Sequence, residues 1–191
     1  SQALRWAALL HDVAKPACFS LDASGRGHFF GHPEEGARVA GRVMGRLALP
    51  KSMTREAQAL IRLHDLPVRP AAASCRKMMS LLEAACPGRG RALAFALVDL
   101  KRADALAKAP ACRGYAVELD AMAARVRAEV AAGCPLTVRE LPVGGGDVIR
   151  ERGLEPGPGV GLVLDALLAA VLAGELGLGR EELLAELRMG E

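Results

Sequence analysis

The sequence is poor in aromatic residues and lacks several features that define other classes of protein. Of its 191 residues, one is tryptophan, one is tyrosine and four are phenylalanine. So few rings argue against a surface on which successive bases of a single-stranded nucleic acid stack. No uncharged apolar stretch is long enough to span a bilayer, and no signal peptide opens the chain. A cytoplasmic protein with no membrane partner is therefore expected.

The five cysteines are scattered along the chain and form no C-x-x-C pair. Such spacing argues against both a disulfide framework and a structural zinc site. The cysteines are Cys18, Cys75, Cys86, Cys112 and Cys134. No methionine opens the chain, and a helical pattern follows Ser1 almost at once, so we expect the sequence to be a piece of a longer protein.

Charge is distributed unevenly between two parts of the chain. Residues 1–133 contain 20 lysines and arginines against 12 aspartates and glutamates, whereas residues 134–191 contain 5 against 10. A basic surface suits a phosphate-rich partner, while an acidic segment is a poor electrostatic anchor for one. We therefore expect a nucleic acid, if one binds, to lie against the first part.

Hydrophobic residues recur with helical periodicity almost throughout, and alternating strand patterns are nearly absent. Proline and glycine mark the ends of segments, as with Pro16 after the first helix and Gly133 after the sixth. Expected helices cover residues 2–14, 33–48, 53–65, 74–86, 89–108, 112–132, 147–152, 158–174 and 180–188. The fold class is therefore all-α, with a helical body at 1–133 and a small helical tail at 134–191.

A histidine and an aspartate, His11 and Asp12, end the first apolar helical run, and Lys15 follows three residues later. An imidazole beside a carboxylate suits a divalent cation, and a lysine can meet a phosphate oxygen on the far side of that cation. The simpler alternative is a helix end whose polar residues face water. Distant residues must complete the site if the first interpretation holds.

All histidines of the chain lie within its first 64 residues, each at an expected helix end or in an adjoining loop. The histidines are His11, His28, His32 and His64, and the candidate carboxylates are Asp12, Asp65, Asp99 and Asp104. Together these side chains could hold one or two divalent ions, which would activate a water and neutralise a phosphate. Taken singly, each histidine could equally serve as a helix cap or a surface hydrogen-bonding group.

Two further patterns could contact RNA phosphates. Arg38, Arg42 and Arg46 recur every four residues on one expected helix, and this stripe could equally be an ordinary solvated face. Gly157 and Gly159 open a long apolar helix, whose exposed amides could grip a phosphate. A tight turn that lets helices pack closely explains these glycines equally well.

Several motifs, taken in order, resemble the HD phosphohydrolase superfamily and, more narrowly, the HD-containing bacterial CCA-adding tRNA nucleotidyltransferases. The motifs are Leu10-His11-Asp12-Val13-Ala14-Lys15-Pro16, Gly27-His28-Phe29-Phe30-Gly31-His32, Leu63-His64-Asp65 and Arg102-Ala103-Asp104-Ala105. The tail resembles the C-terminal region of the same enzymes at residues 138–149, 153–161 and 180–184. The likeness extends over essentially the whole chain.

The resemblance implies an HD-type helical body in which His11, Asp12 and Asp104 bind a divalent metal ion. Mg, Mn and Ni are not distinguished. Asp104 is preferred over Asp99 as the distant ligand, because its Arg-Ala-Asp-Ala setting matches the family. The two aspartates lie five residues apart and so point to different faces of one helix.

The resemblance also implies that His32, His64 and Lys15 line the cleft as further ligands or phosphate contacts. The chain departs from the family in two ways. No histidine precedes His11, although HD enzymes usually supply one from an upstream helix, and the nucleotidyltransferase head is missing. The run Gly144-Gly145-Gly146-Asp147 does not replace that head, because no second carboxylate pair follows in a strand; its aspartate is expected to be a helix N-cap.

The resemblance therefore implies the HD and tRNA-body-binding portion of a CCA-adding tRNA nucleotidyltransferase. Metal-dependent hydrolysis of phosphomonoesters or 2′,3′-cyclic phosphates would be its own activity, and whether this chain is itself an enzyme stays open. The alternatives are a stand-alone HD-family hydrolase of small nucleotides and a catalytically inert RNA-binding module. Expected partners are tRNA and small phosphate esters, and nothing in the sequence indicates an oligomeric state.

Overall fold

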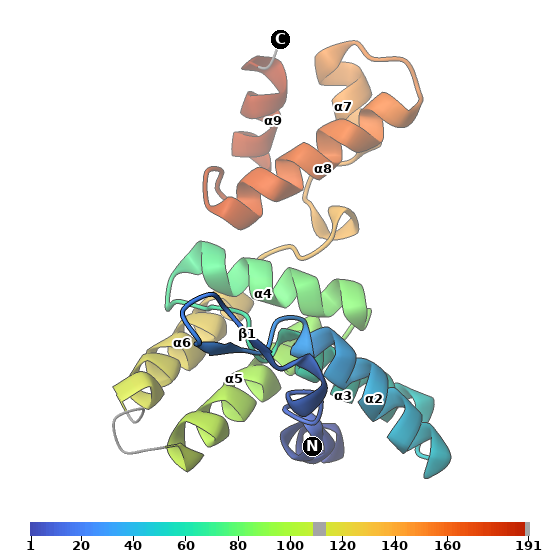
Figure 1. The fold of residues 1–191 in the computed structure, drawn as a ribbon. Helices are drawn as coiled ribbons and strands as arrows, with labels where there is room; N and C mark the ends of the chain where they lie inside the picture. Colours follow the sequence, from blue (N-terminus) through green and yellow to red (C-terminus); the bar gives the residue numbers. More distant parts are fainter. Residues whose placement is uncertain (109–113, 190–191) are drawn as a thin grey trace.

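The computed structural model describes residues 1–108 and 114–189, and it confirms the all-α fold class (Figure 1). The α-helices are α1 (Gln2–Leu10), α2 (His32–Arg46), α3 (Lys51–Leu63), α4 (Ala72–Ala85), α5 (Gly90–Ala107), α6 (Gly114–Ala131), α7 (Gly145–Arg152), α8 (Pro158–Ala173) and α9 (Arg180–Met189). The short elements are η1 (Pro16–Cys18), β1 (Ser20–Leu21), β2 (Gly27–His28) and η3 (Val138–Glu140). Most helix limits agree with the predicted ones to within a few residues, and Cys112 lies outside the described residues. Within the described ranges, no helix combines the length and the apolarity that crossing a membrane requires.

The largest difference from the predicted elements lies between α1 and α2. The α-helix ends at Leu10 rather than at residue 14, and a series of turns follows. The expected loop then contains a short antiparallel hairpin of β1 and β2. Asp22 closes this hairpin, because its Oδ1 accepts the N–H groups of Ser24 and Arg26 at 2.9 and 3.0 Å. Strands of two residues are too short to show a period in the sequence.

In the body, α1 to α6 pack around one hydrophobic core. Its largest fully buried side chains include Leu60, Ile61, Met78, Met79, Leu82 and Leu97. A glycine allows α2 to approach two other helices closely: a Cβ at Gly36 would lie 3.3 Å from the Ile61 side chain and 3.4 Å from the His11 carbonyl. The start of α2 therefore lies against the ends of α1 and α3, which brings three helix ends together.

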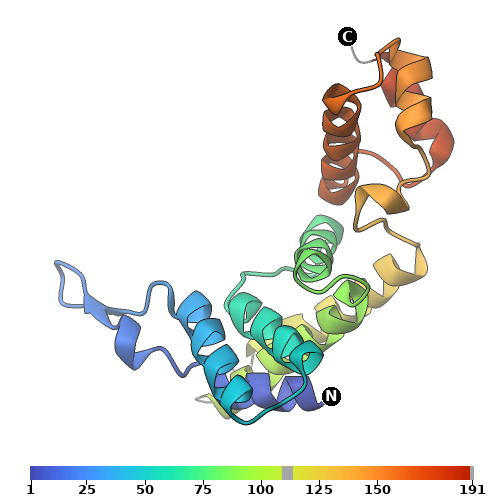
Figure 2. The same cartoon turned by 90° about the vertical axis from the view of Figure 1, so that its right-hand side faces the viewer.

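The tail has a hydrophobic core of its own, built from η3, α7, α8 and α9 (Figure 2). Its buried side chains are Leu141, Val143, Val148, Leu164, Leu167, Val171, Leu183, Leu184 and Leu187. The connector leaves the body just after the predicted boundary, since Leu136 still belongs to the body core. The two cores are therefore distinct groups of buried side chains.

Asp147 does not cap α7 in the way predicted. Gly144 holds the N-cap position, and the Oδ2 atom of Asp147, in the first turn, accepts the Gly144 N–H at 2.9 Å. Arg180 of α9 donates to both oxygens of the same carboxylate, at 3.0 and 2.7 Å. These bonds hold the pKa of Asp147 well below its usual range. Asp147 therefore connects α9 to α7, a long-range role that a local capping pattern cannot reveal.

Arginines of the body connect it to the tail: Arg91 of α5 pairs with Glu140 of η3, and Arg76 reaches α8. Arg76 of α4 donates through Nε to Glu129 at 2.6 Å and through Nη1 to the carbonyl of Val171 in α8 at 2.8 Å. Arg125 forms a second ion pair with Glu129, at 3.0 Å. The buried Glu129 carboxylate is thus paired on both oxygens, and α4, α6 and α8 meet at this point.

Candidate metal centre

Three histidines at the ends of three helices lie close together. His11 follows α1, His32 begins α2 and His64 follows α3. The Nδ1 atom of each ring lies beside the backbone carbonyl three residues earlier, at 2.9, 2.7 and 2.6 Å respectively. A carbonyl can only accept, so each Nδ1 donates its proton and each Nε2 of a neutral ring keeps a lone pair. Histidines that bind metals have this arrangement.

Asp12 lies between these rings. Its Oδ1 is 3.8 Å from Nε2 of His32 and 3.6 Å from Nε2 of His64. This oxygen is buried and has no hydrogen-bond partner among the described residues. The two Nε2 atoms are themselves 3.2 Å apart. When both rings are neutral, three electron-rich atoms therefore face one another with no proton between them.

A divalent cation would resolve this conflict. The ligand atoms of Asp12, His32 and His64 all lie within 4.8 Å of one another. Imidazole nitrogens bind first-row ions at about 2.1 Å, which places neighbouring ligand atoms roughly 3 to 3.5 Å apart. A second proton on a ring is the alternative, and burial disfavours it by lowering the pKa of His64. These residues therefore fit a metal ion.

This set differs from the predicted ligands His11, Asp12 and Asp104. The structure brings those three together as well, because His11 Nε2 lies 3.4 Å from Asp12 Oδ2 and 3.7 Å from Asp104 Oδ1. Each of these carboxylates already has a lysine: Lys15 lies 2.7 Å from Asp12 Oδ2, and Lys108 lies 2.5 Å from Asp104 Oδ2. The unpartnered oxygen is Oδ1 of Asp12. The group that could hold an ion on the Oδ1 side therefore lies next to the predicted set and shares Asp12 with it, and the predicted set stays a prediction.

Opposing effects determine the ionisation of Asp12. Burial raises its pKa, but the hydrogen bond from Lys15 and the nearby charges of His11 and His64 lower it by more. The net pKa lies below the ordinary value, so Asp12 is a carboxylate at neutral pH. Metal ions bind that form of the side chain.

A pocket of about 370 Å³ opens beside Asp12. Its cationic and hydroxyl side chains are Lys15, Lys101, Lys108 and Tyr115. Sequence reasoning missed Lys101, which is buried. Burial lowers the pKa of this lysine, and the nearby carboxylates of Asp65 and Asp104 act in the opposite direction. Lys101 lies three residues before Asp104 and so on the same face of α5, a spacing that could have identified it.

Three candidate residues lie away from the place where His11, Asp12, His32, His64 and Asp104 meet. His28 lies on the hairpin, where its Nε2 is 2.8 Å from Asp22 Oδ2 and its ring stacks on Phe30. Asp99 is exposed and does not line the pocket. Asp65 lines the pocket but does not belong to the group that could hold an ion. The histidines thus divide into three at the centre and one on the hairpin.

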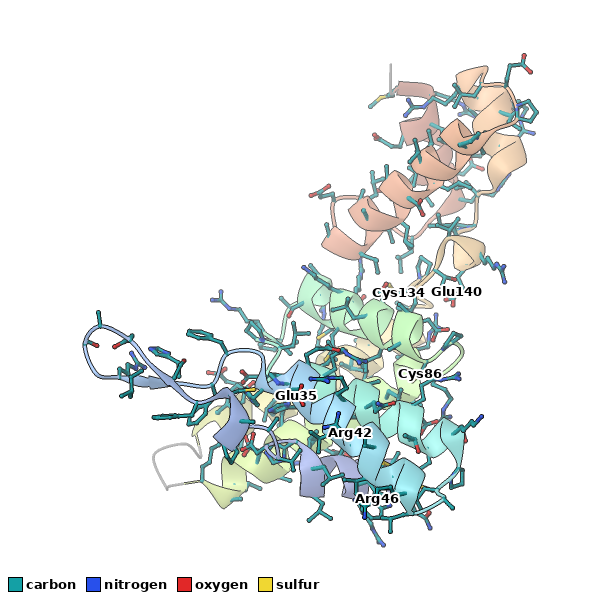
Figure 3. The ribbon with its side chains drawn as sticks, turned by 45° about the vertical axis from the view of Figure 1, so that its right-hand side comes forward. Glu35, Arg42, Arg46, Cys86, Cys134 and Glu140 are labelled. Atoms are coloured by element: carbon teal, nitrogen blue, oxygen red, sulfur yellow. The ribbon has the colours of Figure 1, made fainter. Side chains whose placement is uncertain are left out.

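The expected phosphate stripe lies along one side of α2 (Figure 3). Glu35 of the same helix forms ion pairs with Arg38 and, at 3.7 Å, with Arg42. Arg46, one turn further along, is exposed. The stripe is therefore partly neutralised at one end, and its contact with RNA stays a prediction.

The glycines at the start of α8 do not serve close packing. Gly157 is the N-cap and Gly159 lies in the first turn. A Cβ at Gly159 would meet nothing within 4 Å, and one at Gly157 would meet only the Glu155 carbonyl at 4.0 Å. The packing explanation is therefore wrong for these two positions, and phosphate binding there stays a prediction.

Comparisons with known proteins support the same interpretation. A family model described as "HD domain" matches residues 1–109. The A-adding tRNA nucleotidyltransferase of Deinococcus radiodurans is 33% identical over 180 residues, which cover 93% of this chain and 39% of that enzyme. The CC-adding tRNA nucleotidyltransferase of Thermus thermophilus is 34% identical over 178 residues, which cover 93% of this chain and 38% of that enzyme. This chain thus spans well under half the length of these relatives, and no solved structure matches it.

The matched family model spans more than half of the chain. Its range includes all the side chains that meet at the candidate centre except Tyr115. The resemblance that the motifs indicated is therefore confirmed at the level of the family. The chain belongs to the HD domain family, and over 93% of its length it is homologous to tRNA nucleotidyltransferases.

Proposed function

We propose that the chain is the HD and tRNA-binding portion of a tRNA nucleotidyltransferase, and that its metal centre hydrolyses phosphomonoesters or 2′,3′-cyclic phosphates. The observation that carries the proposal is the buried Oδ1 of Asp12, which faces two Nε2 lone pairs and has no donor. A centre of this kind beside a pocket lined by lysines suits a phosphate ester.

Each group of side chains has a separate task in this proposal. Asp12, His32 and His64 would hold the ion, which when bound activates a water and offsets the negative charge of the phosphate. Lys15 and Lys108 line the pocket and can donate hydrogen bonds to phosphate oxygens. The bonds from the histidine Nδ1 atoms to carbonyls fix the rings, so the site is formed before the substrate arrives.

The tRNA part of the proposal rests on charge and on the relatives. The basic surplus lies in residues 1–133, which include the arginines of α2. Both relatives are named for tRNA substrates. Contacts from arginine to phosphates would position a tRNA without reading its sequence. The body would therefore hold the RNA while the tail contributes little electrostatic attraction.

The decisive experiment compares Asp12→Ala with Asp99→Ala. Both variants lose a carboxylate of the body, but Asp99 is exposed and away from the pocket. Each protein is stripped of metal, reloaded with Mg²⁺, Mn²⁺ or Ni²⁺, and assayed on p-nitrophenyl phosphate and 2′,3′-cyclic AMP. Bound metal is measured after dialysis. We expect wild type and Asp99→Ala to bind metal and hydrolyse at least one ester, and Asp12→Ala to do neither.

Two outcomes would contradict the phosphohydrolase proposal. One is equal activity in all three proteins, and the other is a wild type that is inactive with each of the ions. The second outcome would favour the inert RNA-binding module. Binding of tRNA at low salt tests that module directly, since phosphate contacts weaken steeply as salt rises.

A further inference from the structure

An organised group of aromatic rings lies on the β1–β2 hairpin and the segment after it, which project from the helical body (Figure 2). The His28 and Phe30 rings stack, with centroids 4.9 Å apart and planes at 9°. Asp22 fixes His28, because its Oδ2 lies 2.8 Å from His28 Nε2. Yet Phe30 remains 77% exposed. A chain with few aromatic residues thus holds one ring in a defined position and leaves it open to solvent.

These rings line a pocket of about 560 Å³, which is within the size range of small-molecule sites. Phe29, Phe30 and His28 form part of its lining, together with Arg62 near the end of α3. This pocket shares lining residues with the pocket at the metal centre. The residues that line both are Lys15, Asp65 and Leu66.

Lys15 connects the two pockets. Its Nζ lies 2.7 Å from Oδ2 of Asp12 and 5.7 Å from the centroid of the Phe29 ring. A phosphate bound at this lysine would therefore have the carboxylate centre on one side and aromatic rings on the other. A nucleotide has the matching layout, because a single sugar joins its phosphate to a flat base.

We propose that the rings of His28, Phe29 and Phe30 form a base-binding subsite, so that the metal centre acts on nucleotides. In this proposal Phe30 is a specificity-determining residue. The phosphate end of this inference rests on the proposed function. Phe30 is more exposed than Phe19 and Phe29, and a single ring of this kind accommodates one base, which is consistent with the scarcity of rings for stacking successive bases. Stacking tolerates every base. The subsite therefore distinguishes nucleotides from other phosphate esters and selects weakly among bases.

The test measures KM and kcat for adenosine 3′-monophosphate and for glycerol 2-phosphate, which has no base. Leu21→Ala is the matched control for Phe30→Ala, because Leu21 is exposed on the same hairpin and is absent from the lining of both pockets. Loss of one stacking ring should raise KM at least about fivefold. We expect this rise for the nucleotide only and in Phe30→Ala only, with kcat unchanged, and we expect Phe30→Trp to restore the KM.

A second measurement needs no turnover. Saturation-transfer NMR in the presence of a chelator detects contact between the protein and the H2 and H8 protons of the same nucleotide. We expect transfer to these protons in wild type and Leu21→Ala, and a signal reduced at least about fivefold in Phe30→Ala.

The outcomes separate the subsite from the proposed function. Absence of transfer to the base protons in wild type, or the same nucleotide KM in Phe30→Ala as in wild type, would overturn the subsite. An increase in KM for glycerol 2-phosphate of the same size would also overturn it. A wild type that hydrolyses neither of these esters nor 2′,3′-cyclic AMP would overturn the proposed function instead, and the NMR result would still decide whether the base binds.

Discussion

The body and the tail are built from the same kind of helix, yet Asp147 of the tail and Asp12 of the body differ in what their carboxylate oxygens contact. In the tail, carboxylates are satisfied by arginines: Asp147 pairs with Arg150 and Arg180, and Glu151 pairs with Arg188. In the body, Oδ1 of Asp12 is buried without a partner and faces histidine lone pairs. The ion pairs of Asp147 and Glu151 connect helices of the tail to one another, while the Asp12 carboxylate of the body keeps one oxygen available to a ligand.

This difference shows how to separate structural from functional charges in a small helical protein. A carboxylate whose oxygens all have donors has its bonding capacity filled inside the fold. One that is buried and lacks a donor carries an electrostatic cost that an ion can remove. Substitutions in the two regions should therefore affect metal binding, stability and RNA binding to very different extents.

Removing a ligand of the body centre should have the largest effect. In His64→Ala the ion loses a nitrogen ligand, so we expect metal affinity and hydrolysis to fall roughly 100-fold or more, since loss of even an outer partner costs 10–100-fold. Asp147→Ala is the control from the tail and should leave both unchanged. Metal titration and ester hydrolysis check this, and an equal loss in the two variants would remove the contrast between the regions.

Cavities in the two cores should destabilise the protein but act differently on the site. Leu60 of the body and Leu183 of the tail are both fully buried. Truncating either to alanine should lower the free energy of unfolding by about 2–5 kcal/mol. Denaturant unfolding measures the free energy of unfolding of each variant, and an ester-hydrolysis assay measures its activity. If the cores are independent, Leu183→Ala leaves hydrolysis of the folded protein unchanged; a loss equal to that in Leu60→Ala would show that they are coupled.

The connection through Arg76 should matter less than a core cavity. In Arg76→Ala the buried Glu129 keeps only its pair with Arg125. We expect the free energy of unfolding to fall by about 2 kcal/mol, which is less than the cost of leaving a buried charge without any partner. Lys77→Ala, an exposed neighbour, is the control. Thermal unfolding and limited proteolysis of the connector at 134–144 measure the effect, and no difference between the variants would mean that other α4–α8 contacts suffice.

Charge reversal on α2 should have the smallest effect. Arg46→Glu should weaken tRNA binding several-fold and reduce the slope of affinity against salt by about one phosphate contact. Arg139→Glu changes the same charge on the tail side and should change affinity little. Filter binding across a salt series distinguishes the two. Equal losses would show that net charge, rather than the stripe, attracts the RNA.

Much of the fold could be predicted from the sequence because its signals are local. Helical periodicity and the prolines and glycines at segment ends predicted the helices within a few residues. The hairpin was not predicted, because its strands are too short to show an alternating pattern and its turn is closed by the side chain of Asp22. The capping role given to Asp147 was wrong for a similar reason: a glycine can occupy the N-cap when a later carboxylate and a distant arginine complete the turn.

The candidate site was predictable in its composition but not in its geometry. The motifs named His11, Asp12, His32, His64 and Asp104, and the structure brings these side chains together. Which of them would share an ion depends on the two oxygens of the Asp12 carboxylate. Lys15 engages one of those oxygens and leaves the other bare, and no spacing in the sequence encodes that choice.

By itself, the sequence determined the helices, the chemistry at their ends and the family, because each depends on residues close together along the chain. The tertiary structure decided that Oδ1 of Asp12 faces two anchored imidazoles, that Lys101 is buried near them, and that an exposed ring on the hairpin shares a lining with the centre. These contacts join elements far apart in the chain, so packing alone sets their distances.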